Sequence, residues 1–186
     1  APYLMDMFEN LSFDTIYHEH LSYFSMFPLK QLFGQYGLDI FDVQVYPIQG
    51  NSIRVFVCQS GARPIRASVQ QCVDKEKIFG LQDGAESYFA LAAKIANLKN
   101  AVVSLLIDLK QQGKSIVGYG APAKGNTLLN YYGIGPDVLD YVTEELPSKI
   151  GLFTSGMHIP VVSTSYFWNN FPNYALMLAW NYKDVI

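Results

Sequence analysis

The chain has few of the residues that build metal centres and disulfide frameworks. Its 186 residues include two cysteines, Cys58 and Cys72, and three histidines. The cysteines show neither the paired spacing of a zinc site nor the pattern of a disulfide scaffold, which fits a reducing, cytoplasmic compartment. We therefore expect no metal bound by this chain.

Clustered charge and long apolar runs are also scarce. The net charge is -3 and no run of Lys and Arg occurs, which argues against nucleic acid as a partner. No uninterrupted apolar run reaches the roughly 18 residues of a membrane span, and no signal peptide is visible, so we expect no membrane partner. Because the sequence opens on Ala1 rather than Met, we expect it to be a piece of a longer protein.

What the chain does have is apolar and aromatic side chains, which make up 50% and 15% of it. That is enough for one large or two small folded domains. Ser25 is a predicted N-cap for a helix over residues 26–36, and alternating residues predict strands at 38–46 and 53–58 joined as a β-hairpin by residues 47–51. In the first strand, Phe41, Val43 and Val45 are expected to share one face. Turn-forming residues after the hairpin suggest a domain boundary, giving domains 1–60 and 61–186.

The second part alternates helices and short apolar strands. Helices are expected at 65–79 and 85–111, the latter with an apolar stripe of Tyr88, Leu91, Ile95, Leu98, Val102, Leu105 and Leu109. That stripe predicts a helix packed on its own domain or a neighbour, with a coiled-coil dimer as the alternative. Strands are expected at 115–119, 138–142, 158–162 and 174–180, with a helix up to residue 132 and a helical turn at 164–169. This order predicts an α/β fold with a small Rossmann-like parallel sheet flanked by helices.

A glycine-rich turn follows the first of these strands and opens a helix. Gly118, Gly120 and Ala123 match the G-x-G-x-x-G/A pattern, and Asp140 is expected about 20 residues on at the end of the next strand. Glycines allow a phosphate to approach the backbone closely, and the free amides at a helix N-terminus can donate hydrogen bonds to it. The turn therefore predicts either a phosphate-bearing ligand, such as NAD(P) in an oxidoreductase domain, or a tight turn without any ligand. A non-catalytic interaction module built on the helix at 85–111 is a further alternative.

Two further residues of this turn bear on the ligand. Lys124 adds a positive charge near the expected phosphate. Asn126 stands where a P-loop requires its lysine, which excludes an NTPase. The later loop 151–160, with His158, is expected either to close over a ligand or to be a plain surface loop.

The most reactive stretch is Tyr17, His18, Glu19 and His20. Imidazole exchanges protons near neutral pH, so the run offers a base, an acid and a hydrogen-bond donor within four residues. A buried polar cluster is one alternative. A metal site is another, although zinc would need one or two ligands beyond the two histidines.

With these residues in view, the chain resembles the C-terminal part of the sugar C-methyltransferases that use S-adenosylmethionine. The resemblance is carried by residues 2–4, 13–25, 118–130, 140–142 and 158–160. It implies a longer protein with a zinc-binding N-terminal segment, a methyltransferase domain and a C-terminal Rossmann-like domain. Residues 1–60 would be the tail of the methyltransferase domain, and the sugar nucleotide would lie between it and the last domain.

The resemblance also implies the chemistry. A base removes the proton beside the ketone of a nucleotide-linked 4-keto sugar, and the resulting carbon nucleophile takes up a methyl group. His20 is expected to be the base, Tyr17 the hydrogen-bond donor to the keto or enolate oxygen, and Glu19 the residue that orients the imidazole. The residues expected to bind the substrate are Gly118, Gly120, Lys124, Asn126 and His158. S-adenosylmethionine and zinc would be held by the missing parts, the fragment alone would be inactive, and the protein would be a monomer or a weak homodimer.

Overall fold

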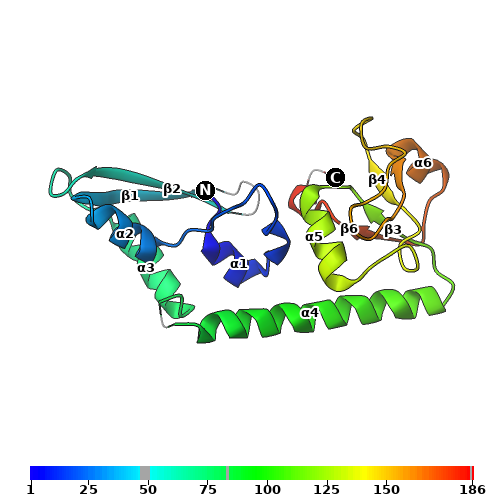
Figure 1. Cartoon of the computed structure of the whole chain (residues 1–186), viewed down its shortest axis with the longest axis horizontal. Helices are drawn as coiled ribbons and strands as arrows, with labels where there is room; N and C mark the ends of the chain where they lie inside the picture. Colours follow the sequence, from blue (N-terminus) through cyan, green and yellow to red (C-terminus); the bar gives the residue numbers. More distant parts are fainter. Residues whose placement is uncertain (47–50, 83, 185) are drawn as a thin grey trace. The chain divides into compact units, whose positions relative to one another are not determined.

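A computed structural model describes residues 1–46, 51–82, 84–184 and 186. The chain forms two compact units. Unit 1 comprises Ala1–Ser12 and Glu19–Ile95, and unit 2 comprises Phe13–His18 and Ala96–Ile186. Figure 1 follows the chain through them by colour. The division falls inside the Tyr/His/Glu/His run, so Tyr17 and His18 belong to one unit and Glu19 and His20 to the other.

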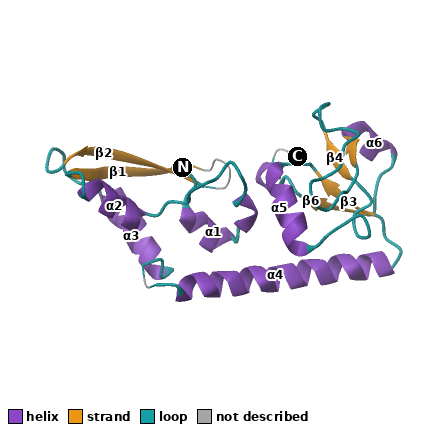
Figure 2. Cartoon of the chain, in the orientation of Figure 1, coloured by secondary structure: helices purple, strands orange, loops and turns teal. Residues whose placement is uncertain are grey.

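Unit 2 contains a parallel sheet of four short strands in the order β5-β4-β3-β6. The strands are β3 (Ile116–Tyr119), β4 (Val142–Glu144), β5 (Val161–Ser163) and β6 (Tyr174–Met177). The helices of this unit are α5 (Ala123–Tyr132), α6 (Thr164–Asn169), the short 3-10 helices η1 (Phe13–Thr15) and η2 (Trp180–Tyr182), and the second half of α4 (Glu86–Gln111). Figure 2 shows α5 and α6 beside the strands. The predicted α/β class is confirmed.

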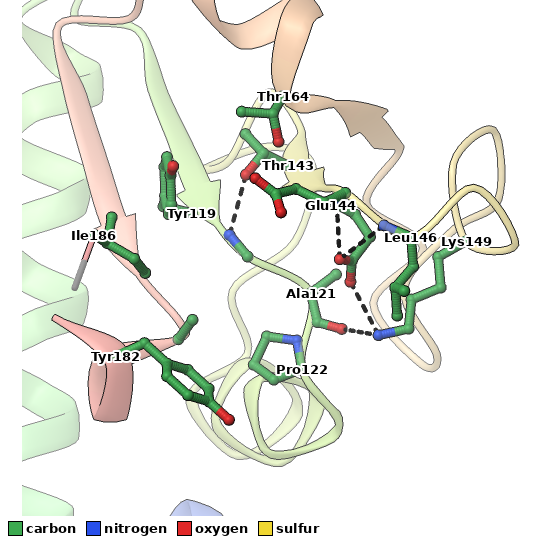
Figure 3. Close-up of a pocket in the computed structure, with 13 residues that line it drawn as sticks. Tyr119, Ala121, Pro122, Thr143, Glu144, Leu146, Lys149, Thr164, Tyr182 and Ile186 are labelled. Carbon is green, nitrogen blue, oxygen red and sulfur yellow. Dashed lines mark hydrogen bonds and ion pairs between the residues drawn. The ribbon is translucent and has the colours of Figure 1, made fainter.

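The centre of the sheet is buried along β3, whereas the edge strand β6 is exposed at its start and half-buried at its end. Fully buried side chains from the strands and their connections form the core, namely Ile116, Val117, Leu129, Leu139, Val142, Ile159 and Leu178. At the carboxyl end of β3 the amide of Gly120 donates to Thr143 Oγ1 at 3.1 Å, which ties the glycine turn to β4 (Figure 3).

The predicted strand at 138–142 is wrong. Val138 and Leu139 are buried, but their amides donate to the carbonyl of Gly135 in a turn. An apolar run that is buried inside a turn has the same composition as a short buried strand, so periodicity does not separate them. The strand begins only at Val142.

Unit 1 is built from helices packed on a two-stranded antiparallel sheet. Its elements are α1 (Leu4–Asn10), α2 (Met26–Gly34), β1 (Leu38–Tyr46), β2 (Ser52–Gln59), α3 (Ala67–Ile78) and the first half of α4. The hairpin and both predicted helices that flank it are confirmed. The helix α1 was not predicted, because its aromatic and methionine side chains show no clear helical period, and residues 47–50 of the predicted hairpin loop lie outside the described residues.

A β-bulge changes the faces of the hairpin. Ile40 pairs with Val57 and Asp42 pairs with Phe56, so Phe41 is the extra residue. A bulge reverses the alternation on its strand. Phe41 is therefore separated from Val43 and Val45, which stay in register opposite Val55 and Ile53, so the prediction that all three share one face is wrong for Phe41. Val43 is buried, whereas Val45 near the end of the strand is 44% exposed.

A buried carboxylate joins three elements of unit 1. Glu76 on α3 is fully buried and accepts hydrogen bonds from Tyr3 Oη at 3.0 Å and from the amides of Met26 at 2.7 Å and Phe27 at 3.4 Å. Burial raises the pKa of Glu76 above its usual value, against the effect of these donors. Because the first amides of a helix have no partner inside the helix, Glu76 caps α2 from a neighbouring helix.

The long helix α4 is confirmed, but its predicted stripe is only partly correct. Leu91 and Ile95 are buried, whereas Tyr88, Leu98 and Leu105 are exposed. By length and composition α4 is also the one described helix that could cross a membrane, with a mean hydropathy of 1.4 over 18 residues. Only 17% of that stretch is buried inside the structure, and a single helix that meets this criterion is weak evidence for a membrane span.

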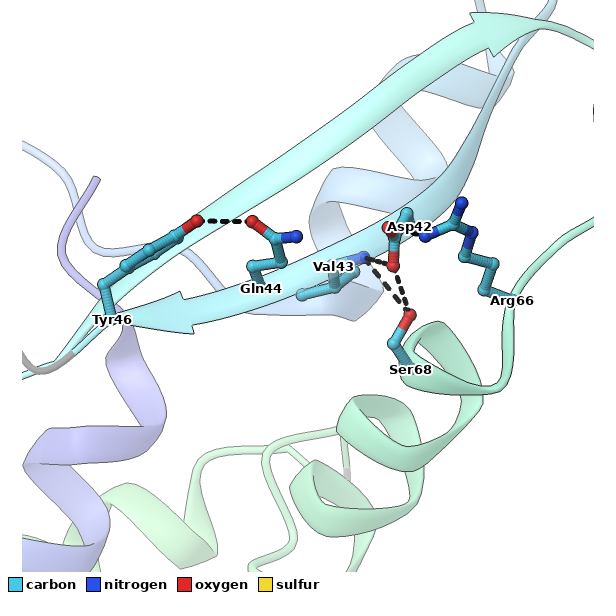
Figure 4. Close-up of polar contacts among 6 residues, drawn as sticks. All are labelled: Asp42, Val43, Gln44, Tyr46, Arg66 and Ser68. Atoms are coloured by element: carbon cyan, nitrogen blue, oxygen red, sulfur yellow. Dashed lines mark hydrogen bonds and ion pairs between the residues drawn. The ribbon is translucent and has the colours of Figure 1, made fainter.

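A second carboxylate of unit 1 is held at the hairpin. Asp42 accepts from Ser68 Oγ at 2.7 Å, from the Val43 amide at 2.9 Å and from Arg66 Nη1 at 2.8 Å (Figure 4). The hydrogen bond from Ser68, with help from the other two donors and against a smaller effect of burial, lowers the pKa of Asp42.

We expect Asp42→Asn to reduce stability in a pH-dependent way. A carboxylate whose pKa is depressed on folding stabilises the protein above its unfolded pKa, and this is lost as the pH falls through the folded value. The difference in melting temperature between wild type and variant should therefore shrink below about pH 4. Thermal unfolding followed by circular dichroism at neutral and acidic pH measures this, with Asp108→Asn on the exposed surface of α4 as control. A constant difference across the range would contradict the expectation.

Candidate functional site

The start of the Tyr/His/Glu/His run is fixed to α5 inside unit 2. The ring of Phe13 contacts Tyr131 edge-on, at 5.2 Å between centroids, and stacks on Tyr132 at 5.6 Å. Thr127 Oγ1 donates to the carbonyl of Ile16 at 3.3 Å. These contacts hold together residues that are more than 100 positions apart in the sequence.

Buried charge reinforces this attachment. Asp14 Oδ2 accepts a 2.6 Å hydrogen bond from Trp180 Nε1. Lys124 Nζ lies 3.8 Å from the centroid of the Trp180 ring and donates to Asn181. Burial raises the pKa of Asp14 and lowers that of Lys124 to about 8, and the attraction between them opposes both shifts.

A pocket of about 330 Å³ opens beside this segment, and we call it the tyrosine pocket. It is lined by Tyr17, His18, Ala123, Asn126, Thr127, Asn130 and Ser155. Asn130 Nδ2 donates to the carbonyls of Asn126 and Ser155, which holds the loop after β4 against α5. The structure thus brings the predicted residues Tyr17 and Asn126 to one pocket.

Two more pockets follow along the carboxyl ends of the strands. The middle pocket, of about 270 Å³, shares Ala123, Asn126 and Ser155 with the tyrosine pocket. The strand-end pocket, of about 740 Å³, shares Ala121 and Lys149 with the middle one. It is lined by Tyr119, Gly120, Ala121, Pro122, Thr143, Glu144, Glu145, Leu146, Lys149, Thr164, Ala179, Tyr182 and Ile186 (Figure 3). Ligands of open α/β sheets bind in this position, outside the carboxyl ends of the strands.

Lys149 is the cation at the junction of these two pockets. Its Nζ donates to the Ala121 carbonyl and to Glu144 Oε2, both at 2.9 Å (Figure 3). Burial by itself would raise the pKa of Glu144. The hydrogen bonds from Lys149 and from the amides of Glu145 and Leu146 outweigh it and lower the pKa below its usual value. Lys149 was missed in the sequence because a lysine in a turn-rich loop carries no local signal.

The two predicted glycines are explained by packing. A Cβ on Gly118 would lie 2.7 Å from a methyl of Val142 and 2.8 Å from one of Leu178. Gly120 has φ +84°, and a Cβ there would lie 2.8 Å from that of Ala179. Gly120 lines the strand-end pocket, whereas Gly118 is buried in the sheet.

The remaining predicted residues lie in different places. Lys124 is 8% exposed and lines none of the three pockets just described. His158 is exposed on the loop, where its Nδ1 lies 2.9 Å from the carbonyl of Gly156, and it also lines none of them. In unit 1, Glu19 is exposed and His20 is half-buried with its ring edge-on to Tyr23 at 6.2 Å.

Asp140 is not at the end of a strand, which corrects the predicted dinucleotide pattern. Its carboxylate accepts from Lys110 Nζ at 2.7 Å and from the amide of Ile116 at 3.3 Å. Ile116 begins β3, so Asp140 lies at the amino edge of the sheet, away from the glycine turn that follows Tyr119. The acidic side chain at the carboxyl end of β4 is Glu144 instead.

No group of three or more His, Cys, Asp or Glu side chains suited to a metal ion occurs among the described residues. The alternative in which His18 and His20 belong to a metal site therefore finds no third ligand of these types among the described residues.

The fold and these pockets define a Rossmann-like α/β unit with pockets at its strand ends and with Tyr17 and His18 beside α5. Comparison with known proteins agrees: the family of the C-methyltransferase C-terminal domain matches residues 47–186. The C-methyltransferase NovU of Streptomyces niveus is 34% identical over 187 residues, which cover 100% of this chain and 44% of that protein. The chain belongs to the C-methyltransferase family and spans less than half of this curated relative.

We expect Gly118→Ala to lower the stability of unit 2, because the added methyl group has no room between β4 and β6. Overpacking of this kind costs about 1–3 kcal/mol. Denaturant unfolding measures the effect, with Gly34→Ala as control because nothing lies within 4 Å of a Cβ there. Normal stability combined with lost ligand affinity would show instead that Gly118 serves a ligand.

Proposed function

We propose that the intact protein is an S-adenosylmethionine-dependent C-methyltransferase acting on a nucleotide-linked keto-deoxysugar. The observation that carries this proposal is the meeting of Tyr17 and His18 with Asn126 in the tyrosine pocket, in a chain of C-methyltransferase family. A phenol, an imidazole and an amide together suit a neutral, oxygen-rich ligand that gains negative charge on one oxygen during reaction.

The three neighbouring pockets match the three parts of a sugar nucleotide. In this proposal the sugar occupies the tyrosine pocket and the diphosphate the middle pocket, near Lys149 and the first turn of α5. The nucleoside then occupies the strand-end pocket, between Tyr119 and Tyr182. Glu144 and Glu145 line that last pocket, and their charge favours sugar hydroxyls there over phosphate.

The proton transfer is assigned to the motif itself. His20 takes the proton from the carbon beside the ketone, Tyr17 donates a hydrogen bond to the oxygen that becomes negative, and Glu19 orients the imidazole. Tyr17 and His20 are three positions apart in the sequence, so the chain keeps their Cα atoms within about 11 Å. A base and an oxyanion donor at that separation can act on the two ends of one ketone.

The methyl donor does not fit the described residues of unit 1. Their one sheet is the antiparallel hairpin of β1 and β2, which lacks the parallel strand ends where such cofactors bind. Unit 2 does have such strand ends, but in this proposal its pockets hold the sugar nucleotide. We therefore assign the donor, and the zinc ion expected with it, to parts of the protein outside this chain. The proposal also includes a cytoplasmic location and a division into domains near residue 60. It further includes an inactive isolated fragment, a monomeric or weakly dimeric state, and no nucleic-acid or membrane partner.

His20→Ala in the full-length enzyme should reduce kcat by about 10²–10⁴-fold, because a positioned general base contributes that much. KM for the sugar nucleotide should change far less, since the imidazole acts on the reacting carbon. Steady-state methyl transfer from labelled donor measures both, after equal melting temperatures establish that the variant is folded. Unchanged turnover would remove His20 from the mechanism.

Lys149→Gln should act on binding rather than on turnover. Losing a charge-assisted contact worth about 1.5–3 kcal/mol raises KM by roughly 10–100-fold, with kcat little changed. Lys99→Gln is the matched control: Lys99 Nζ also donates to a backbone carbonyl of unit 2, that of Tyr131, but it lines none of the three pockets. An equal effect of both variants would contradict the placement of the diphosphate.

A further inference from the structure

The cluster of Asp14, Lys124 and Trp180 has no role in the proton transfer, although it buries two charged groups. Asp14 is 3% exposed and Lys124 is 8% exposed. Removing charged groups from water is costly, and even a direct buried ion pair contributes little to stability. We therefore look for the role of this cluster in the segments whose positions it fixes.

The cluster fixes the position of the residues that lead into Tyr17. The hydrogen bond from Trp180 to Asp14 joins η1 to η2 across 166 positions of sequence. Beyond Asp14 the backbone folds tightly: the amide of Ile16 donates to the carbonyl of Phe13 at 2.9 Å, and that of Tyr17 to Thr15 at 3.0 Å. A displacement at Asp14 is therefore transmitted through this turn to Tyr17.

We propose that Asp14 is a positioning residue for the methyl transfer, which holds Tyr17 at the tyrosine pocket through its hydrogen bond to Trp180. Lys124 also helps to keep the indole in place, through its contact with the ring and its bond to Asn181. This inference rests on the proposed function, because Tyr17 is the group whose position matters.

The charges around Asp14 agree with a geometric role. The groups that face it are Lys124 on α5 and Tyr132 at the end of that helix, and its carboxylate adds to the effect of burial in raising the pKa of Tyr132. Lys124 is the cation whose charge acts on the Asp14 carboxylate and opposes the effect of burial on its pKa. Without the carboxylate, the lysine would lose the interaction that opposes its desolvation, and its pKa would fall further below about 8.

The test is a double-mutant cycle in the full-length enzyme with Asp14→Ala, Trp180→Phe and the two combined. Misplacing a reacting group by about 1 Å lowers the reaction rate by up to about 100-fold. We therefore expect each single variant to lower kcat by about 10–100-fold, with KM for the sugar nucleotide within about threefold. Because both remove one hydrogen bond, the double variant should lose little more than either single variant. Asp14→Asn keeps an oxygen for Trp180 and should retain most of kcat.

The control is Trp168→Phe, since Trp168 is 61% exposed on α6 of the same unit. It should leave kcat and KM unchanged. A readout independent of activity is the indole N–H signal of Trp180 in the NMR spectrum, assigned by its loss in Trp180→Phe. It should shift in Asp14→Ala and stay in place in Asp42→Ala, whose carboxylate belongs to unit 1.

A shifted indole signal with unchanged kcat in Asp14→Ala would overturn the positioning role while leaving the methyl transfer intact. Additive losses in the cycle would overturn it too. If Asp14→Ala does not fold, Trp180→Phe against Trp168→Phe decides the matter alone. Failure of the unmodified enzyme to methylate any keto-sugar nucleotide would instead overturn the proposed function, and the indole signal would still report whether the hydrogen bond exists.

Discussion

The attachment of residues 13–18 to α5 is the constraint on which the rest of the site depends. A six-residue segment has no stable structure alone, since ordering each residue costs about 1–2 kcal/mol of backbone entropy. Here that cost is offset by the stacking of Phe13 on Tyr132 and by the bond between Asp14 and Trp180. These contacts convert a flexible stretch into one wall of a pocket, so that Tyr17 faces the residues of a helix that begins more than 100 positions later.

This attachment also explains why the Tyr/His/Glu/His run is divided between the two units. Tyr17 and His18 lie in the same compact unit as the parallel sheet, whereas Glu19 and His20 lie in the unit with the hairpin. On the far side of the run the chain is held again: the amide of Leu4 donates to the carbonyl of Phe24, and Glu76 caps the helix that starts at Met26. Residues 17–20 are therefore carried on a short connection that is secured at both ends, each end by its own unit.

The glycine turn shows how one sequence pattern serves two purposes. Gly118 is required because neighbouring strands leave no room for a methyl group, and Gly120 because its backbone has a positive φ. Neither fact demands a dinucleotide. With Asp140 at the amino edge of the sheet and bonded to Lys110, the acidic residue at the pocket is Glu144, which is already bonded to Lys149. The turn and its surroundings thus keep the architecture of a nucleotide fold with a different set of polar groups at its strand ends.

The sequence by itself determined the local elements. Alternation predicted β1 at Leu38–Tyr46 and composition predicted the helical turn at Thr164–Asn169, because such signals reside in a few consecutive residues. It also singled out Tyr17 and Asn126, but it missed α1 and Lys149 and misplaced β4. Only the tertiary structure decided that Lys124 is buried under Trp180 while Lys149 reaches the pockets. The solvation and neighbours of a charged side chain depend on residues distant in sequence, and no local pattern records them.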